Sequence, residues 1–389
     1  MASVRKRTWK NTSGENKTAW VVDYTDSHGN RQRKHYLNKK AADAFRIRVE
    51  SQMQVGTYRP SADRITVKEV CESFLDRCTL RNERNERMTR KMLVVYKGHV
   101  NNYILNGTYG IGGKKLSQLT ARSIGDFRDS LRDAHVSVPT VRKILSTLHG
   151  ALEFAVSQDF VANNAAHGTR VIGPRDEGSK KIVPPLKKEV QCLLEAADED
   201  FRLMLMFAAS TGARAGEQWA VRWRDIDLEN NLLNIARRVD AYGEEGAPKS
   251  AAGVRSVPLS SQLIAKLKAF KLKSKFKGPA ELVFANECGG YIGHDNLMKR
   301  RFHPLFNKVN MERQGEPVRR FNWHALRHFA VSCWIEAGFS PKTVQTFAGH
   351  ASLQVTMDRY GHLFPREDHK KTMNRIARGV FGNRERSRK

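Results

Sequence analysis

Side chains that could act on a phosphate group gather in residues 322–360 of this 389-residue sequence. His324 and Arg327 are three residues apart, so they are neighbours on the first turn of a predicted helix. His350 follows the Ala-Gly at the end of a second predicted helix, and Tyr360 ends a third. Because helix starts also present backbone N–H groups to anions, the pattern predicts a phosphate site that contains a nucleophile.

The elements expected to hold these groups can be read from caps and apolar spacing. Asn322 is a suitable N-cap, and Gly338 and Gly349 are suitable helix ends. Ser340-Pro341 is a typical cap and first residue of a helix. Apolar residues recur after Asn322 at helical spacing, which predicts that His324 and Arg327 lie on the opposite face. These apolar residues are Leu326, Phe329, Ala330, Cys333 and Trp334.

A further arginine stands in a predicted helix break, in the stretch T-G-A-R-A-G-E. Taken alone, Arg214 could simply form an ion pair with Glu217. Together with Arg327 it could also neutralise the non-bridging oxygens of a phosphodiester. Guanidinium groups do this with planar, bidentate hydrogen bonds that a lysine cannot imitate.

The charge of the chain indicates the partner. It has 68 Lys and Arg against 40 Asp and Glu, a formal charge of +28. Such an excess favours a polyanion, most often nucleic acid, over a soluble protein that is merely basic. No apolar run approaches the ~20 residues of a membrane span, and the N-terminus lacks the apolar core of a signal peptide. Five scattered cysteines without a C-x-x-C pair favour reduced thiols over disulfides or a zinc site.

Residues 1–60 are predicted to form a separate module, with 13 Lys and Arg against 5 Asp and Glu. Alternating residues and turn signals predict a three-stranded sheet followed by one helix. The predicted strands are residues 4–9, 20–24 and 31–37, and the helix is residues 39–52. Arg31, Arg33 and Lys34 on the third strand are candidate DNA contacts. The alternative is a sheet edge that these charges only protect from pairing.

The rest of the chain is predicted to contain two further domains. Residues 65–166 form a helical unit of four helices, with caps at Thr66, Thr89 and Thr120, and residues 167–185 are a Gly- and Pro-rich linker. Residues 186–389 mix helices with two hairpins, one at 225–236 and one that pairs 247–250 with 254–259. The expected fold class is therefore multidomain and mainly α, with small β-sheets and an α+β C-terminal domain.

At this point the sequence resembles the tyrosine recombinases, the integrases of temperate phages and mobile genetic islands. T-G-A-R-A-G-E resembles the first arginine box of the family, H-A-L-R-H the second and A-G-H the third, with Tyr360 as the nucleophile. P-K-S-A-A-G-V-R-S-V-P-L resembles the lysine hairpin, which singles out Lys249. Ala213, Gly253 and Ala348 depart from the usual residues, and none of them replaces a catalytic group. The resemblance covers most of the chain.

The resemblance implies a site-specific recombinase that integrates and excises a mobile element. Tyr360 would attack a DNA phosphate and form a 3′-phosphotyrosine, with neither metal nor ATP, and strand exchange would pass through a Holliday junction. Arg214 and Arg327 would hold the phosphate oxygens, His350 would hydrogen-bond to the phosphate, and Glu217 would orient Arg214. A phenol with a pKa of ~10 needs help to lose its proton. His324 is the expected base, and Lys249 the expected acid for the leaving 5′-oxygen.

The resemblance also implies partners. Residues 1–60 would bind arm sites, residues 65–166 and the catalytic domain would bind core sites, and four protomers would act together on DNA. An excision factor and a DNA-bending protein are expected, in a bacterial cytoplasm. Three alternatives remain: a chromosome-dimer-resolving recombinase, which lacks the arm module; a type IB topoisomerase; and a DNA-binding regulator derived from an integrase. The last would be expected to have lost a catalytic residue, and here every position is filled.

Overall fold

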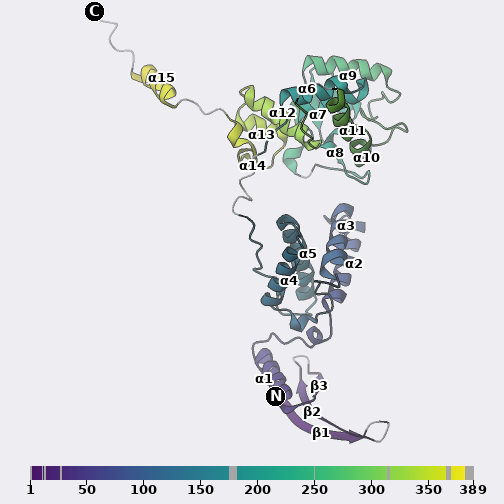
Figure 1. The fold of residues 1–389 in the computed structure, drawn as a ribbon, viewed down its shortest axis with the longest axis vertical. Helices are drawn as coiled ribbons and strands as arrows, with labels where there is room; N and C mark the ends of the chain where they lie inside the picture. Colours follow the sequence, from purple (N-terminus) through teal and green to yellow (C-terminus); the bar gives the residue numbers. More distant parts are fainter. Residues whose placement is uncertain are drawn as a thin grey trace, which may run out of the picture. The chain divides into compact units, whose positions relative to one another are not determined.

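The computed structural model describes residues 2–10, 12, 15–26, 29–174, 182–248, 250–312, 316–364 and 369–381, and Figure 1 shows their fold. The chain divides into two compact units, Met1–Glu177 and Gly178–Lys389, so the division falls inside the predicted linker. Helices predominate in the described residues, and the sheets are small and antiparallel. The predicted fold class is therefore confirmed, whereas the separate domain limits remain predictions.

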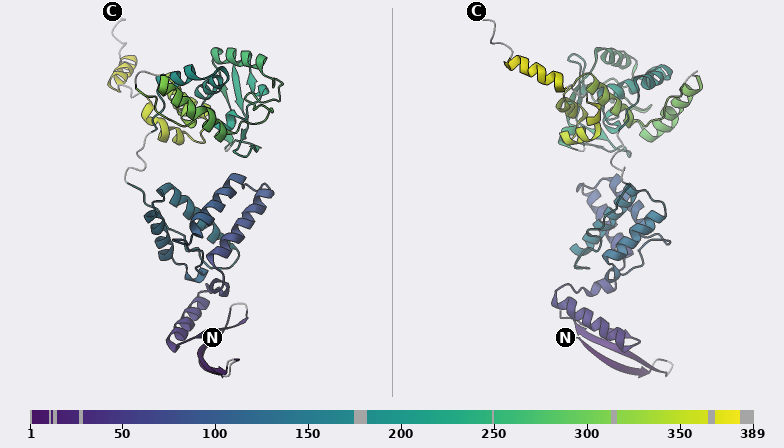
Figure 2. Two further views of the ribbon diagram at one scale, coloured as in Figure 1. Left: turned by 45° about the vertical axis from the view of Figure 1, so that its right-hand side comes forward. Right: turned by 60° about the vertical axis from the view of Figure 1, so that its left-hand side comes forward.

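The first unit begins with the predicted three-stranded sheet and helix. Strands β1 (Ser3–Lys10), β2 (Asn16–Thr25) and β3 (Arg31–Tyr36) pair antiparallel in that order. Helix α1 (Lys39–Gln54) starts at Asn38, whose side chain accepts a hydrogen bond from the Ala41 N–H at 2.8 Å. The helix lies along one face of the sheet (Figure 2). Between them is a small core of Val22, Tyr24, Ala42, Phe45, Val49 and Tyr58.

The helical part of the first unit consists of α2 (Val67–Glu83), α3 (Arg90–His99), α4 (Ala121–Asp133) and α5 (Val138–Ser157). Thr66, Thr89 and Thr120 cap the first three as predicted, each accepting a hydrogen bond from a backbone N–H three residues later. The long helix α5 provides much of the core through apolar residues at helical spacing. Its buried members include Ile144, Leu148, Ala151, Leu152 and Ala155.

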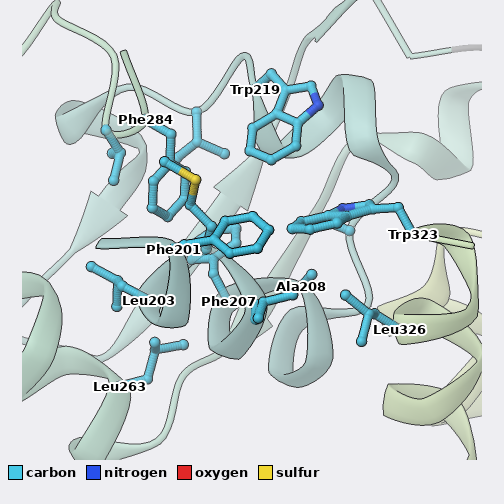
Figure 3. Close-up of a cluster of buried hydrophobic side chains, with 14 of the residues drawn as sticks. Phe201, Leu203, Phe207, Ala208, Trp219, Leu263, Phe284, Trp323 and Leu326 are labelled. Atoms are coloured by element: carbon cyan, nitrogen blue, oxygen red, sulfur yellow. The ribbon is translucent and has the colours of Figure 1, made fainter. Parts of the chain in front are cut away.

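The second unit is built around helices α7 and α12, which pack together. Aromatic side chains from distant segments meet there, among them Phe201, Phe207, Trp219, Phe284 and Trp323 (Figure 3). Its helices are α6 (Lys187–Ala196), α7 (Glu199–Thr211), α8 (Ala215–Gln218), α9 (Ser261–Lys273), α10 (His294–Leu297), α11 (His303–Glu312), α12 (His324–Glu336), α13 (Pro341–Ala348), α14 (Leu353–Tyr360) and α15 (His369–Phe381). Its strands are β4 (Ile226–Asp227), β5 (Leu232–Ile235), β6 (Arg238–Val239), β7 (Glu245–Gly246) and β8 (Arg255–Pro258).

One of the two predicted hairpins in this unit is correct. Strands β4 and β5 pair antiparallel around a turn that contains Asn231, whose φ of 56° is typical of such a turn. The second prediction gives β8 the wrong partner, because β8 pairs with β5, and the described residues 247, 248 and 250 belong to no strand. Pairing with β5 places Val257 opposite Leu233, and both side chains are buried in the domain core. Core burial therefore outweighs the shorter connection in selecting the partner of β8.

Of the helices in the described ranges, none is long and apolar enough to span a lipid bilayer.

Candidate active site

Two glycines with left-handed backbones shape the site. Gly212 ends α7 with φ 58°, and Gly349 ends α13 with φ 63°. A Cβ on Gly212 would stand 2.8 Å from a ring carbon of Trp334, and one on Gly349 would stand 2.9 Å from a guanidinium nitrogen of Arg255. Both positions therefore need glycine for backbone conformation and for space. The predicted helix ends at Gly212 and Gly349 are therefore confirmed.

Three arginines converge on the C-terminal end of α13. Each donates a hydrogen bond to one of three successive backbone carbonyls at that end. The pairs are Arg255 Nε with Phe347 O at 2.7 Å, Arg327 Nη2 with Ala348 O, and Arg214 Nη2 with Gly349 O at 3.2 Å. The last carbonyls of a helix lack partners within the helix and carry partial negative charge. The end of α13 thus holds three cations from three different segments.

Arg327 is buried, although the apolar spacing predicted that it would face away from the packed side of its helix. Its residue exposure is 2%, and Nη1 donates a second hydrogen bond to Gly212 O at 2.7 Å. The carbonyls at the ends of α7 and α13 make this burial possible. These segments are distant in the sequence, so the apolar spacing around Arg327 gives no sign of them. Burial, with repulsion from Arg214 and Arg255, lowers the pKa of Arg327 to about 9. The guanidinium remains charged at neutral pH and would be stabilised by an anion.

Glu217 is the carboxylate at the centre of this cluster. Its Oε1 accepts from Arg214 Nη1 at 2.6 Å, and its Oε2 accepts from Arg255 Nη2 at 2.9 Å. The backbone N–H of Arg214 also donates to Oε2 at 3.0 Å. Burial alone would raise the pKa of Glu217, but Arg255 and Arg214 lower it below the usual value. This geometry fits the predicted orienting role of Glu217, which remains a proposal.

Arg255 was not identified in the sequence. Its side chain is 2% exposed and also donates from Nη1 to Gly253 O at 2.9 Å. It therefore connects Glu217, the end of α13 and the segment before β8. One signal in the sequence could have identified it. Arg255 stands two residues before Val257 in a predicted strand, so the two side chains lie on the same buried face, where a charged group needs a buried partner.

His350 presents a free nitrogen to the site. Its Nδ1 lies 2.9 Å from Thr356 Oγ1, whereas Nε2 is buried and has no hydrogen-bond partner within the described part of the chain. Burial and the nearby arginines, first Arg327 and then Arg214, lower the pKa of His350 to about 3, so the ring is neutral at pH 7. A buried polar atom without a partner is unusual in proteins. The arrangement fits a hydrogen bond to a phosphate oxygen.

Tyr360 is completely buried at the end of α14. Its ring stacks on His350 with centroids 6.0 Å apart, and its hydroxyl lies 2.6 Å from Nδ1 of His328. Burial raises the pKa of Tyr360, and the opposing effect of Arg327 and Arg359 does not offset it. The phenol is therefore protonated at neutral pH in the DNA-free protein.

His324, the expected base, makes no hydrogen bond to Tyr360 in the described structure. It stands at the first position of α12, where Asn322 Oδ1 accepts from the Ala325 N–H at 3.0 Å. Its ring contacts His328 edge-on at 4.8 Å. Burial, then His328 and Arg327, lower the pKa of His324 to about 4. Sequence reasoning missed His328, although it stands in the H-A-L-R-H stretch next to Arg327.

The remaining predicted residues lie outside this cluster. Lys249 falls outside the described residues, so its role stays a prediction. The sheet register places Arg31 and Arg33 on the open face of β3, whereas Lys34 faces α1. The ammonium of Lys34 pairs with Asp63 and lies 4.7 Å from the Phe45 ring centroid. The structure therefore does not bring Lys34 together with Arg31 and Arg33.

Metal ligands are not grouped in the described ranges: no three His, Cys, Asp or Glu side chains lie together as a metal ion would need. The absence of a metal from the reaction remains an expectation.

Known proteins share this sequence and fold. The sequence profile described as the phage integrase family matches residues 186–367. The chain is 29% identical over 310 residues to the tyrosine recombinase XerC-like protein of Caldanaerobacter subterraneus subsp. tengcongensis, covering 72% of this chain and 77% of that protein.

Two solved structures share the fold at low sequence identity. The Tn1549 transposon integrase in complex with a circular intermediate DNA has a TM-score of 0.64 at 15% identity, covering 81% of this chain and 99% of that one. The lambda integrase tetramer bound to a Holliday junction has a TM-score of 0.53 at 18% identity, covering 89% and 95%. These findings place residues 186–367 in the phage integrase family of tyrosine recombinases, and the two solved structures extend the likeness in fold to most of the chain.

Proposed function

We propose that this protein is a site-specific DNA recombinase that integrates and excises a mobile genetic element. The observation that carries the proposal is the buried cluster at the end of α13. There, three arginines bind the last carbonyls of the helix, and two of them, Arg214 and Arg255, also bind Glu217, beside a buried tyrosine. Such an excess of fixed positive charge next to a nucleophile suits attack on a phosphodiester, whose transition state gathers negative charge on the non-bridging oxygens.

In this proposal each group has a defined task. Arg214, the most accessible of the three arginines with a side chain 36% exposed, receives the phosphate together with Arg327. His350 Nε2 hydrogen-bonds to a phosphate oxygen, and Tyr360 attacks phosphorus to form a 3′-phosphotyrosine. Lys249 protonates the leaving 5′-oxygen. Because the phosphotyrosine conserves the energy of the bond, the reverse step needs no ATP.

The first experiment tests for the covalent intermediate. Wild type and Tyr360→Phe are incubated, without divalent metal, with nicked DNA that carries the junction sequence of the element. The samples are then examined for an SDS-stable protein–DNA adduct. We expect an adduct with wild type only. An adduct with both proteins would move the nucleophile to another residue, and none with either, on DNA that is bound, would support a DNA-binding regulator.

The assembly is part of the same proposal. Two DNA sites with two strands each require four tyrosines, so four protomers would act together, as lambda integrase does in its Holliday-junction structure. Residues 1–60 would bind arm sites, and an excision factor and a DNA-bending protein would set direction, in the cytoplasm of a bacterium. Removal of the chain before Thr66 should weaken integration and leave core-site cleavage intact. Unchanged integration by the shortened protein would contradict the arm-binding role.

A chromosome-dimer-resolving recombinase is the second candidate, because the XerC-like protein is among the relatives. If the protein is such a recombinase, it should recombine DNA without residues 1–60. The truncation experiment therefore separates the two candidates. A topoisomerase would instead relax supercoiled DNA that lacks any specific site, which a plasmid relaxation assay measures directly.

A further inference from the structure

Attack by Tyr360 requires a group that accepts the proton of its hydroxyl. Tyr360 has no exposed surface, so water cannot take the proton while the ring occupies this position. Burial also raises the pKa of the phenol, so the hydroxyl does not ionise unaided near pH 7. A protein group that contacts the hydroxyl must therefore accept the proton.

We propose that His328 is this proton acceptor and that its Nδ1 also positions the phenol for attack. Nδ1 lies 2.6 Å from the Tyr360 hydroxyl, within the distance that general-base catalysis requires. His324 makes no such contact in the described structure and touches only the His328 ring, at 4.8 Å. The inference rests on the proposed function, because it assigns a proton acceptor to that same reaction.

The protonation state of His328 agrees with an accepting role. Burial and the positive charges of Arg327 and Arg359 lower the pKa of His328 to about 4. The ring is thus neutral at pH 7, with one nitrogen free to accept a hydrogen bond. A bound phosphate would bring negative charge close to these groups and raise the pKa of His328, which strengthens the base when the substrate is present.

The position of His328 on α12 links it to the residues proposed to bind phosphate. It follows Arg327 directly on α12, so the acceptor and one phosphate-binding arginine are carried by the same rigid helix. Tyr360 packs against this helix, in a cluster that includes Val331 and Ile335. DNA must open a path to the buried hydroxyl, and the proposal requires that the phenol stay within reach of His328 when it does so.

The proposed step balances as follows. The O–H bond of Tyr360 breaks and its proton passes to Nδ1 of His328. The oxygen electron pair forms the new bond to phosphorus. The bond from phosphorus to the 5′-oxygen breaks, and that oxygen keeps the electron pair and takes a proton from the general acid. In religation the 5′-hydroxyl returns its proton to the general acid and attacks phosphorus, the bond from phosphorus to the Tyr360 oxygen breaks, and His328 returns its proton to that oxygen.

Two substitutions distinguish proton transfer from positioning. In His328→Asn, the amide oxygen takes nearly the place of Nδ1, so it can accept a hydrogen bond but cannot take a proton. In His328→Gln, the acceptor is moved toward the place of Nε2, so the positioning is lost as well. His303→Asn is the matched control, because this exposed histidine on α11 lies outside the site.

The experiment measures the single-turnover rate of adduct formation on the nicked junction DNA, from about pH 5.5 to 9. We expect His328→Asn to lower the rate near pH 7 by about 10²- to 10⁴-fold, the usual range for a general base. His328→Gln should lower it at least as much, and His303→Asn should match wild type. The wild-type rate should fall only where His328 becomes protonated and be level at higher pH, whereas the rate of His328→Asn should rise throughout the range, because without a base it follows the fraction of ionised phenol. DNA affinity and thermal melting confirm that each variant is folded.

The groups around His328 that could shape the wild-type profile are His324 and Arg327 on α12 and Arg359 and Tyr360 on α14. A His324→Asn variant is therefore measured in parallel. A rate for His328→Asn within about threefold of wild type would overturn the proposal. So would a loss confined to His324→Asn, or a faster reaction by His328→Asn, which would make the contact a restraint on Tyr360.

A readout without DNA separates this inference from the proposed function. In wild type labelled with 15N-histidine, the Nδ1 resonance of His328 should show an accepted hydrogen bond that Tyr360→Phe removes. No change between the two proteins would overturn the contact even if the recombinase activity stands. Conversely, failure of wild type to form any adduct would refute the proposed function while leaving the contact intact.

Discussion

Arg255 offers the sharpest test of how the arginine cluster is held. Its guanidinium, 2% exposed as a side chain, donates to Glu217 at 2.9 Å, to Phe347 O at 2.7 Å and to Gly253 O at 2.9 Å. In Arg255→Met a chain of similar length remains, but the charge and all three hydrogen bonds are lost. Glu217 would then be a buried carboxylate with Arg214 as its remaining ion-pair partner.

The expected effect on stability is large. Removing one partner of a buried ion pair costs about 3–5 kcal/mol, because an uncompensated charge is left behind. For a domain of this size, 1 kcal/mol shifts the melting temperature by about 2–4 °C, so the second unit should melt roughly 6–20 °C lower. Because Glu217 also accepts a hydrogen bond from Arg214 Nη1, we expect adduct formation to fall even at temperatures where the variant is folded.

Denaturant unfolding of the full chain, followed by tryptophan fluorescence, measures this effect. Four of the six tryptophans, Trp219, Trp223, Trp323 and Trp334, belong to the second unit and report chiefly on its unfolding. Arg300→Met is the matched control, since Arg300 is exposed and should change stability by less than about 0.5 kcal/mol.

A double-mutant cycle with Glu217→Leu tests whether the effect of Arg255→Met arises from the ion pair. The double variant should be less destabilised than the sum of the two single variants by more than about 1 kcal/mol. If Arg255→Met behaves like Arg300→Met, or if the two losses simply add, Arg255 does not hold Glu217 in the way described.

Three further predictions concern other parts of the molecule. Gly349→Ala should destabilise the second unit by about 1–3 kcal/mol in denaturant unfolding, because φ is +63° and the new Cβ meets a guanidinium nitrogen at 2.9 Å. The pKa of His350 is about 3 in the fold against ~6.5 unfolded, so only the unfolded chain takes up this proton as pH falls below ~6.5. Stability should therefore decrease toward pH 4, with up to ~1.4 kcal/mol per unit from His350 beside the contributions of His324 and His328, and in His350→Gln the slope should be smaller by the share of His350. In the double variant Arg31→Ala, Arg33→Ala, the slope of the logarithm of arm-site affinity against the logarithm of salt concentration should become less steep, by about the amount expected for two lost phosphate contacts. Lys34→Ala should instead lower the stability of the fold and leave that slope unchanged.

Local signals were sufficient for the elements that carry the site. Caps such as Thr66 and Thr120 and helix ends such as Gly212 and Gly349 depend on a few neighbouring residues, so the sequence predicts them well. The candidate residues Arg214, Arg327, His350 and Tyr360 could also be named from spacing and resemblance. The structure brings these four together from the residue before α8, from α12, from the segment after α13 and from α14.

What the sequence did not reveal depends on contacts between distant segments. Arg255 is separated from Glu217 by 38 positions and from Phe347 by 92, and no local pattern encodes either contact. The same holds for the pairing of β8 with β5 and for the burial of Arg327. His328 was close at hand in the sequence, but its hydroxyl partner is 32 positions away, so only the fold distinguishes it from His324.

The balance of charge in the cluster explains why these contacts matter for function. Arg214, Arg255 and Arg327 carry three positive charges and Glu217 carries one negative charge, which leaves a net +2. The carbonyls at the end of α13 offset this only in part, because a helix end carries about half a charge. Burial first, and then this remaining repulsion, lowers the pKa values of Arg327 and His350.

A phosphodiester under attack by a phenolate approaches a charge of about −2, which would relieve that repulsion at the transition state more than in the ground state. Interactions that strengthen in the transition state are the ones that accelerate a reaction. The fold thus holds the arginines together against their repulsion, and a bound DNA phosphate would relieve it. Bound junction DNA should therefore raise the melting temperature of the second unit.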